Sequence, residues 1–462
     1  MKTITKRLSL LILILVMTLT AFSSGCSFIT SSNPNDGDST QSQPSQGTLN
    51  KVEVNVDLKN LSEEFGGITY VGKSHDEAPY GSVAETIEKS KVNYSSVAIF
   101  ITTSSGLICG SGVIVDIDDG VNNGNLEDNI FYVVTCNHVI SVCESVEADV
   151  SVYVPDANGR NYDDVGYDEK YAFSGKVGGD IDLTKPVSLV GGDNASDIAV
   201  LRLFISDDAL ASTIVKAKIM SDEYSLKLGE SVFAIGNSEG SHGGWVSSGV
   251  VADTGSVEEI STIGKMTLIG ISLDIYSGNS GGGLFNLYGE LVGITNAGKT
   301  IEGADGTSSS VGINYAIPLK TSTDLVKDTG FVNVVKQLIA TYVKSAGKNY
   351  GYVKGRTDVY WFELGLLSGR PAISSVVAGS QADGQVQTGD VIVGYTINGG
   401  NYNEVTTYYE ISDALYSLSV GDQIAIKFSR TGNYGNATTF TKTFTAKQYY
   451  FCNTGDYTNI KA

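Results

Sequence analysis

A serine, a histidine and an aspartate of this chain occur in settings where the three side chains could act together. Ser280 lies in the glycine-rich stretch Gly278-Asn279-Ser280-Gly281-Gly282. A serine hydroxyl is a weak nucleophile at its own pKa, so it needs a base that accepts its proton. Of the three histidines, His138 ends an apolar run (FYVVTCNHVI), where a strand would hold it rigidly, whereas His75 and His242 lie in polar or glycine-rich stretches.

Asp197 supplies the carboxylate. It begins a second apolar run (DIAVL), so its charge should be buried and needs a partner. An N–H of the His138 ring suits this role, and the contact would orient the imidazole and stabilise its protonated form. Gly278 can adopt a positive φ, so its N–H and that of Ser280 can point into one pocket and bind an oxyanion. The pattern predicts acyl transfer through Ser280, with no metal or cofactor, although each motif alone could be a plain turn or strand cap.

The elements that must position these residues are short strands. Glycine is abundant (54) and proline scarce (7), and Val/Ile-rich runs alternate with Gly/Asn/Asp clusters, which is typical of an all-β pattern. Two inserts interrupt the pattern, at 116–129 and 153–186, and their roles stay open. The first is acidic, but it lacks the ligand order of an EF-hand and is interpreted as a solvated loop. The expected strands lie at 107–115, 131–140, 198–204, 231–235, 266–273, 284–285, 291–294 and 312–317.

Several motifs together resemble the HtrA (high-temperature-requirement A) family of serine proteases. They are LICGSGVIV, TCNHVI, SDIAVLRL, VFAIGNSEG, WVSSGVVADTGS, SGNSGGGLFN, ELVGITNAG and VGINYAIP, spread over residues 83 to about 320. The resemblance implies a mainly β fold: a chymotrypsin-like double β-barrel of two perpendicular six-stranded barrels over 83–325, with the triad His138, Asp197 and Ser280 in between. It also implies a smaller C-terminal α+β PDZ-like domain and often a homotrimer.

The C-terminal third agrees with this resemblance. The periodicity around 324–345 predicts a helix, and we expect a linker helix at 326–349 followed by a PDZ-like domain at 350–450. The predicted carboxylate-binding loop consists of Phe362, Glu363, Leu364 and Gly365. Its backbone amides would hold the C-terminus of a peptide as an added strand. The segment departs from the usual glycine-rich form of that loop.

Substrate preference is open between two readings. Asp274 stands six residues before Ser280, as an aspartate does at the bottom of the specificity pocket of trypsin, and Asn296, Gly298 and Gly312 would line the pocket. This predicts cleavage after Lys or Arg. The HtrA resemblance implies small aliphatic residues instead. Asn279 stands where trypsin-like zymogens carry an aspartate, so activation by N-terminal clipping is not expected.

The N-terminus predicts export. A basic start, an apolar stretch from Leu8 to Phe22 and Ser23-Ser24-Gly25-Cys26 resemble a bacterial lipoprotein signal peptide (1–26) with lipidation at Cys26. A polar tether (27–50) and a segment of uncertain structure (51–82) follow. We expect an extracytoplasmic, lipid-anchored protein, with plain secretion as the alternative. The net charge of −20 speaks against nucleic acid as a partner.

Four further cysteines remain: Cys109, Cys136, Cys143 and Cys452. Four cysteines in an exported protein allow three full pairings. Cys109 and Cys136 are one candidate pair, and buried free thiols are the other reading.

The predicted function is therefore a serine endopeptidase of the bacterial envelope that cleaves unfolded or extended polypeptides in protein quality control. The alternative is a catalytically silent scaffold or chaperone that keeps the fold and binds peptides. A secreted digestive protease is a weaker rival, because the tether and the PDZ-like tail do not suit it.

Overall fold

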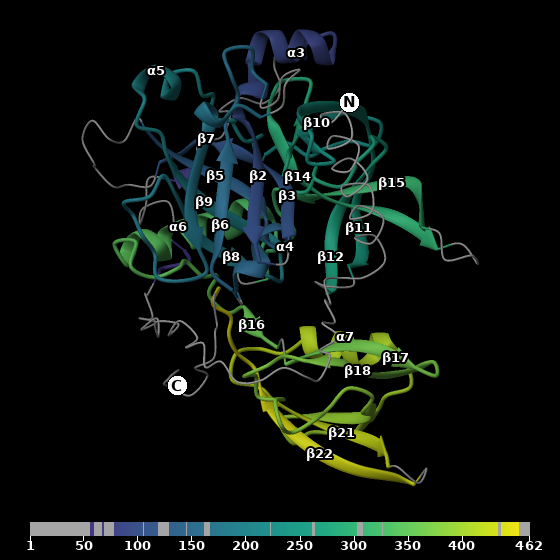
Figure 1. Ribbon diagram of the computed structural model, residues 1–462. Coiled ribbons are helices and arrows are strands. Elements are labelled where there is room, and N and C mark those ends of the chain that lie inside the picture. Colours follow the sequence, from purple (N-terminus) through teal and green to yellow (C-terminus); the bar gives the residue numbers. More distant parts are fainter. Residues whose placement is uncertain are drawn as a thin grey trace, which may run out of the picture.

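The structure is a computed structural model that describes residues 56–59, 67–68, 78–104, 106–118, 129–144, 146–160, 167–221, 223–260, 264–302, 308–325, 327–359, 361–432 and 436–451. The predicted signal peptide with Cys26, the tether, His75, most of the insert 116–129 and Cys452 lie outside the described residues. Figure 1 shows a larger β body that carries the predicted triad, and a smaller domain below it.

The first half of the larger body is a seven-stranded antiparallel sheet in the order β7-β6-β2-β3-β5-β9-β8. A Cβ on Gly175 of β7 would lie 1.8 Å from the backbone oxygen of Val187 in β8, so the two ends of the sheet nearly meet. The resemblance implied six strands here, and the structure has seven. The strands are β2 (Ser96–Thr103), β3 (Gly106–Val115), β5 (Ile130–Cys136), β6 (Ala148–Tyr153), β7 (Ala172–Val177), β8 (Val187–Asp193) and β9 (Ile198–Phe204).

The second half is a closed six-stranded barrel in the order β10-β11-β12-β15-β14-β13. Closure removes exposed strand edges and fixes the turns between strands. With the first half, it confirms the prediction of a mainly β fold with two barrel-like sheets. The strands are β10 (Ser231–Ser238), β11 (His242–Ile260), β12 (Gly264–Ile271), β13 (Gly283–Asn286), β14 (Leu291–Glu302) and β15 (Ser308–Pro318).

Short helices and a small ribbon surround these sheets. Helix α3 begins behind the N-cap Ser82, whose hydroxyl accepts from Glu85 N. The other pieces are α3 (Val83–Ser90), η1 (Val92–Ser95), α4 (Asn137–Ile140), η3 (Ser141–Glu144), η4 (Glu169–Tyr171), α5 (Asp208–Ala211), β1 (Gly67–Ile68) and β4 (Ile117–Asp118).

Helix α6 (Phe331–Lys344) is shorter than the linker helix expected at 326–349, and it packs into the larger body. It packs against β8 and β9, and Phe331, Val334 and Leu338 are fully buried in the same apolar cluster as the barrels. The helix that the amphipathic period predicted is confirmed. The helix is part of the core of the larger body because its apolar face covers the outer strands of the first sheet.

The smaller domain has its own apolar core, centred on Trp361, Ile392 and Phe444. Its main sheet runs β17-β18-β19-β21-β22, with β20 on β19 and helix α7 beside β17 and β18. Its elements are β16 (Thr357–Asp358), β17 (Phe362–Leu367), β18 (Arg370–Val376), β19 (Val391–Ile397), β20 (Asn403–Glu404), α7 (Tyr408–Tyr416), β21 (Gln423–Thr431), β22 (Ala437–Thr445) and β23 (Lys447–Gln448).

The segment Phe362, Glu363, Leu364 and Gly365 is not a loop, as the sequence-based interpretation had it. All four residues lie in β17 and pair with β18. Phe362 is buried in the core of the smaller domain, and pairing with β18 along the whole segment holds it as a strand.

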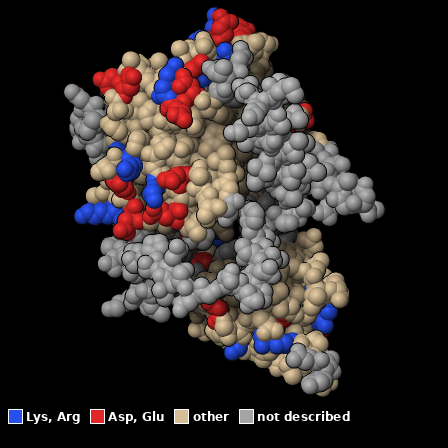
Figure 2. All heavy atoms as spheres, in the orientation of Figure 1, with Lys and Arg blue, Asp and Glu red and all other residues tan. Residues whose placement is uncertain are grey.

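Acidic and basic side chains lie close to one another on the face of the larger body seen in Figure 2, rather than in one field of a single sign. Among the described residues, no helix is both long and apolar enough to cross a membrane.

Candidate active site

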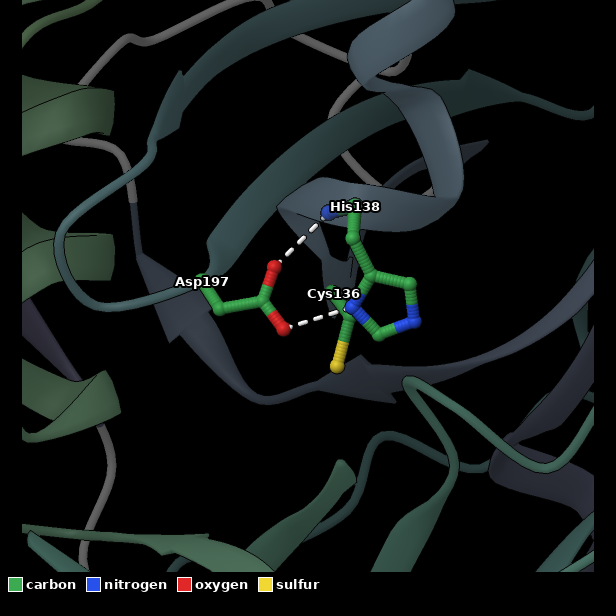
Figure 3. A group of neighbouring side chains, drawn as sticks. All are labelled: Cys136, His138 and Asp197. Atoms are coloured by element: carbon green, nitrogen blue, oxygen red, sulfur yellow. Dashed lines mark hydrogen bonds and ion pairs between the residues drawn. The ribbon is translucent and has the colours of Figure 1, made fainter. Parts of the chain in front are cut away.

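His138 and Asp197 meet at one end of the first sheet. His138 lies in α4, which follows β5 directly, and Asp197 lies in the turn between β8 and β9. The His138 Nδ1 atom is 2.6 Å from Asp197 Oδ2, and the backbone N–H of His138 donates to Oδ1 over 2.7 Å (Figure 3). β5 and β9 are neighbours in the sheet, so their adjoining ends bring together residues 59 positions apart.

The Asp197 carboxylate is fully buried and well supplied with donors. Besides His138, it accepts a hydrogen bond from Asn296 Nδ2 over 2.5 Å. Asp197 has a φ of +54°, a left-handed conformation that is unfavourable for a residue with a Cβ. The backbone bond from Asn137 N to Asp197 O, 2.9 Å long, holds this conformation against α4.

The environment of His138 favours its protonated form. Burial of the ring lowers the pKa of His138, but the charge of Asp197 and its hydrogen bond raise it more, so the pKa lies above the usual value. The side chain is 37% exposed, so the free ring edge remains open to a reaction partner. This is the electrostatic setting that a general base of an acyl transfer needs.

Ser280 comes from the second barrel, in the turn before β13. Gly278 has a φ of +91°, and a Cβ there would lie 2.3 Å from Asn237 O, so only glycine fits. The turn is fastened to the first sheet by Ser111 of β3. The Ser111 hydroxyl donates to Gly278 O over 2.6 Å, and Ser111 N donates to Ser280 O over 2.8 Å.

The Ser280 hydroxyl is turned toward its own barrel. It donates to Asn296 O over 3.0 Å, and no hydrogen bond joins it to His138 among the residues that the structure describes. The structure therefore brings His138 and Asp197 together and leaves Ser280 outside their hydrogen-bonded pair. The hydroxyl must leave Asn296 O before it can donate to the free ring nitrogen.

The two backbone N–H groups predicted to bind the oxyanion, those of Gly278 and Ser280, are not occupied by other hydrogen bonds among the described residues. Among the described parts of the chain, no acceptor is recorded for the N–H of Gly278 or of Ser280, whereas the N–H groups of Asn279, Gly281 and Gly282 are all bonded within the turn region. Two backbone donors remain available beside the nucleophile, which is what stabilisation of an oxyanion requires.

Cys136 extends this group. Its side chain is fully buried, and its sulfur, one His138 nitrogen and one Asp197 oxygen lie within 4.8 Å of one another (Figure 3). The three atoms are of types that bind metals. However, two ligands of one zinc ion at about 2.1 Å each would not approach to the 2.6 Å that separates Nδ1 from Oδ2. The spacing fits a shared proton better than a metal ion.

Of the residues expected to form a specificity pocket, Gly298 lies close to the segment of Asp274, because a Cβ on Gly298 would lie 3.8 Å from the backbone oxygen of Ile275. Asp274 is exposed, whereas a carboxylate that selects Lys or Arg would lie at the bottom of a pocket. Asn296 is 2% exposed and directs its amide at Asp197, so it supports the acidic residue instead. Gly298 pairs with Asn314 across β14 and β15, and a Cβ on Gly312 would meet nothing within 4 Å.

Sequence reasoning missed the supporting roles of Asn296 and Ser111. Both lie within motifs that the resemblance rests on, but only the fold shows that they bridge the two barrels. The candidate disulfide between Cys109 and Cys136 is wrong, because both are free thiols, as is Cys143. Cys109 contacts the 240 turn, since a Cβ on Gly240 would lie 2.7 Å from its sulfur. Cys136 points into the active site.

The sequence of this chain is similar to those of trypsin-like serine proteases. Residues 110–294 match the family model of the trypsin-like peptidase domain. The chain is 27% identical over 326 residues to the serine protease Do-like HtrA of Lactobacillus helveticus, covering 70% of this chain and 66% of that protein. It is 26% identical over 410 residues to the periplasmic pH-dependent serine endoprotease DegQ of Escherichia coli, covering 83% and 75% respectively.

For other relatives, the match covers only about half of the relative's own length. The chain spans 55% of the length of the periplasmic serine endoprotease DegP of Escherichia coli, at 28% identity. A solved structure of an HtrA-type protease, AlgW with a tripeptide, aligns with 80% of this chain and 97% of its own at 22% identity, with a TM-score of 0.38.

Proposed function

Because the chain belongs to the HtrA family of trypsin-like serine proteases, we propose that it is a serine endopeptidase in which Ser280 is the nucleophile, His138 the general base and Asp197 the residue that orients it. The observation that carries this proposal is the 2.6 Å contact between His138 Nδ1 and Asp197 Oδ2, in a pair that Asn296 links to Ser280. A buried carboxylate on one ring nitrogen leaves the other nitrogen as the proton acceptor.

In the proposed reaction, the Ser280 hydroxyl first leaves Asn296 O and donates to the free nitrogen of His138. Exchanging one hydrogen bond for another costs about 1 kcal/mol or less, so substrate binding can drive it. His138 takes the proton as Oγ attacks the carbonyl carbon, and the N–H groups of Gly278 and Ser280 bind the oxyanion. His138 then protonates the leaving amine. Water, deprotonated by the same ring, releases the acyl group from Ser280.

We further propose that the substrates are extended or unfolded polypeptides outside the cytoplasm, in protein quality control. The support for the location is that DegQ and DegP are periplasmic endoproteases by name. Lipid anchoring at Cys26 and assembly into a trimer belong to the same proposal. Asp274 is exposed, so we propose small aliphatic residues rather than Lys or Arg at the cleaved position. Matched Val/Ala and Arg/Lys fluorogenic peptides measure this preference.

The smaller domain suits a PDZ-like role in binding peptide C-termini. β17 is the last strand of its sheet, with Leu366 and Leu367 64% and 48% exposed. A peptide can add to such an edge as a further strand. Fluorescence anisotropy with a free-carboxylate peptide and its C-terminal amide tests this role, and equal binding of the two would contradict carboxylate recognition.

A silent scaffold is the second candidate, and one observation favours it: the Ser280 hydroxyl donates to Asn296 O instead of to His138. A fluorophosphonate probe separates the two, because it labels only an activated serine. We expect labelling of the wild type, a loss of casein hydrolysis on the order of 10⁶-fold in Ser280→Ala, and no change in Ser212→Ala, whose exposed hydroxyl bonds only to Ala209 O. An unlabelled wild type that still binds peptides would support the scaffold.

A further inference from the structure

The chain returns to the larger body after the smaller domain is complete. β23 pairs with β16 in a two-stranded ribbon, so the segments that enter and leave the smaller domain run side by side. We call residues 351–358 and 446–451 the neck. Beyond β23, Phe451 is fully buried in the apolar cluster of the larger body, with its ring centroid 5.6 Å from that of Tyr350. The end of the neck is therefore anchored in the body that carries His138 and Asp197.

The outgoing segment of the neck contacts the element that holds His138. The hydroxyl of Tyr449 donates to Glu144 Oε1 over 2.5 Å, and Glu144 closes η3, which continues α4. The same oxygen accepts from the side chain of Asn137, the neighbour of His138, over 3.4 Å. Burial and then the charge of Glu144 raise the pKa of Tyr449 well above its usual value, so the hydroxyl remains a donor throughout the working pH range.

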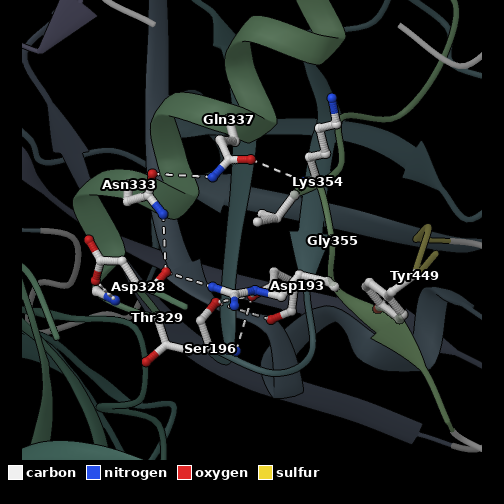
Figure 4. Close-up of polar contacts among 12 residues, drawn as sticks. Asp193, Ser196, Asp328, Thr329, Asn333, Gln337, Lys354, Gly355 and Tyr449 are labelled. Carbon is white, nitrogen blue, oxygen red and sulfur yellow. Dashed lines mark hydrogen bonds and ion pairs between the residues drawn. The ribbon is translucent and has the colours of Figure 1, made fainter. Parts of the chain in front are cut away.

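The incoming segment contacts the turn that holds Asp197. Arg356 Nε donates to Asp193 Oδ2 over 3.3 Å, and that oxygen also accepts from the N–H and the hydroxyl of Ser196, over 3.1 and 2.5 Å. Figure 4 shows Ser196 beside Asp193, with Tyr449 apart from them on the outgoing segment of the neck. Arg356 is 8% exposed and Asp193 is fully buried, so this is a desolvated ion pair.

The Asp193 turn has a reason to need such support. Asp197 holds a left-handed φ, a conformation that local hydrogen bonds must support in a residue with a Cβ. A strained conformation persists only where the surroundings determine it. Arg356 also donates to Asp328 O over 2.6 Å, at the start of α6, so the arginine ties the turn to the core of the larger body.

We propose that Tyr449 and Arg356 are positioning residues for the His138–Asp197 pair, so that the segments flanking the smaller domain set the geometry of the catalytic pair in the larger one. The inference rests on the proposed peptidase function. Tyr449 reaches the element of His138 through Glu144 of η3. Arg356 reaches the turn of Asp197 through Asp193. A displacement of the neck would loosen both members at once.

Two charge-conserving variants test this proposal in the chain starting after residue 50. Tyr449→Phe removes the hydroxyl that reaches Glu144, and Arg356→Lys keeps the charge but loses the planar fork that spans Asp193 and Asp328. The matched control is Tyr402→Phe, whose hydroxyl donates to Val393 O within the smaller domain. The readouts are kcat and KM on a short peptide, and the far-downfield NMR signal of the His138 Nδ1 proton, which reports the contact to Asp197 directly.

We expect kcat to fall about 5- to 20-fold in both neck variants with KM within twofold, since only orientation is lost. The downfield proton signal should move upfield or broaden. The control should match the wild type in both readouts. Wild-type kcat and an unchanged signal in both neck variants would overturn the proposal, and so would loss of the folded protein in both, because the role would then be purely structural. If the wild type cleaves no peptide, the peptidase function fails, while the proton signal still decides the positioning role.

Discussion

The two halves of the larger body differ in how their proposed catalytic groups are hydrogen-bonded. The first sheet presents a finished pair, with Asp197 bonded to both the ring and the backbone of His138. The second barrel presents Ser280 with its hydroxyl bonded to Asn296 O. Under the proposed mechanism, the difference teaches that folding completes the His138–Asp197 pair, whereas the Ser280 hydroxyl must leave Asn296 O before it can attack. Substrate binding is the natural trigger, because an acyl group at the turn of Ser280 would engage the free amides.

The strongest test of the finished pair is Asp197→Asn. The amide would favour the wrong ring tautomer, and kcat should fall about 10⁴-fold. Because Asp197 raises the pKa of His138, the acid limb of the kcat/KM profile of the wild type should lie above the pH expected for a free histidine, and it should move to lower pH in the variant. Asp156→Asn, in an exposed turn, is the control. An unmoved acid limb would contradict the assignment of the base.

The nucleophile side is tested by Gly278→Ala. An added Cβ would meet Asn237 O at 2.3 Å and turn the N–H of residue 278 away from the oxyanion, so kcat should fall about 10²- to 10³-fold. Gly389→Ala is a matched control, since its φ of +88° is nearly the same and a Cβ there meets nothing within 4 Å. The downfield signal of His138 should stay in place in the Gly278 variant. A simultaneous loss of that signal would mean that the two halves are not independent.

Asn296 links the halves, because its amide donates to Asp197 and its carbonyl holds the Ser280 hydroxyl. Asn296→Ala removes the side-chain amide that donates to Asp197 and keeps the backbone carbonyl that accepts from Ser280. We expect kcat to fall about 10-fold, as for the loss of one hydrogen bond to a charged group. Asn403→Ala, on the exposed strand β20, serves as the control. A change in fluorophosphonate labelling larger than the change in kcat would place the main effect on Ser280 instead.

The smallest effect on peptidase activity is expected from alkylation of the cysteine thiols. Burial raises the pKa of Cys136 well above its usual value, assisted by the charge of Asp197, and burial raises that of Cys143 to about 12. Neither thiol should react with iodoacetamide at about pH 8 in the folded protein, since the thiolate is the reactive form. Cys109 is partly exposed and should react first. Mass spectrometry that finds Cys136 modified in active protein would contradict the buried environment.

The sequence allowed the β class and the candidate catalytic residues to be predicted because those features are local. His138 follows an apolar strand, Asp197 precedes one, and the glycines around Ser280 are needed for a turn with positive φ. Contacts between distant segments were not predictable. Asn296 looked like a pocket residue, because nothing in the spacing reveals that its amide faces Asp197. The same limitation applies to α6, whose period indicated a helix but not the sheet that it covers.

Because Phe451 is buried in the larger body, the folded units do not follow one another simply along the sequence. The larger body contains residues from before and from after the smaller domain. The peptidase body needs residues on both sides of the smaller domain, so cutting the chain after α6 leaves a barrel pair with part of its interior missing. The apolar cluster of the larger body is therefore complete only in a chain that extends to residue 451.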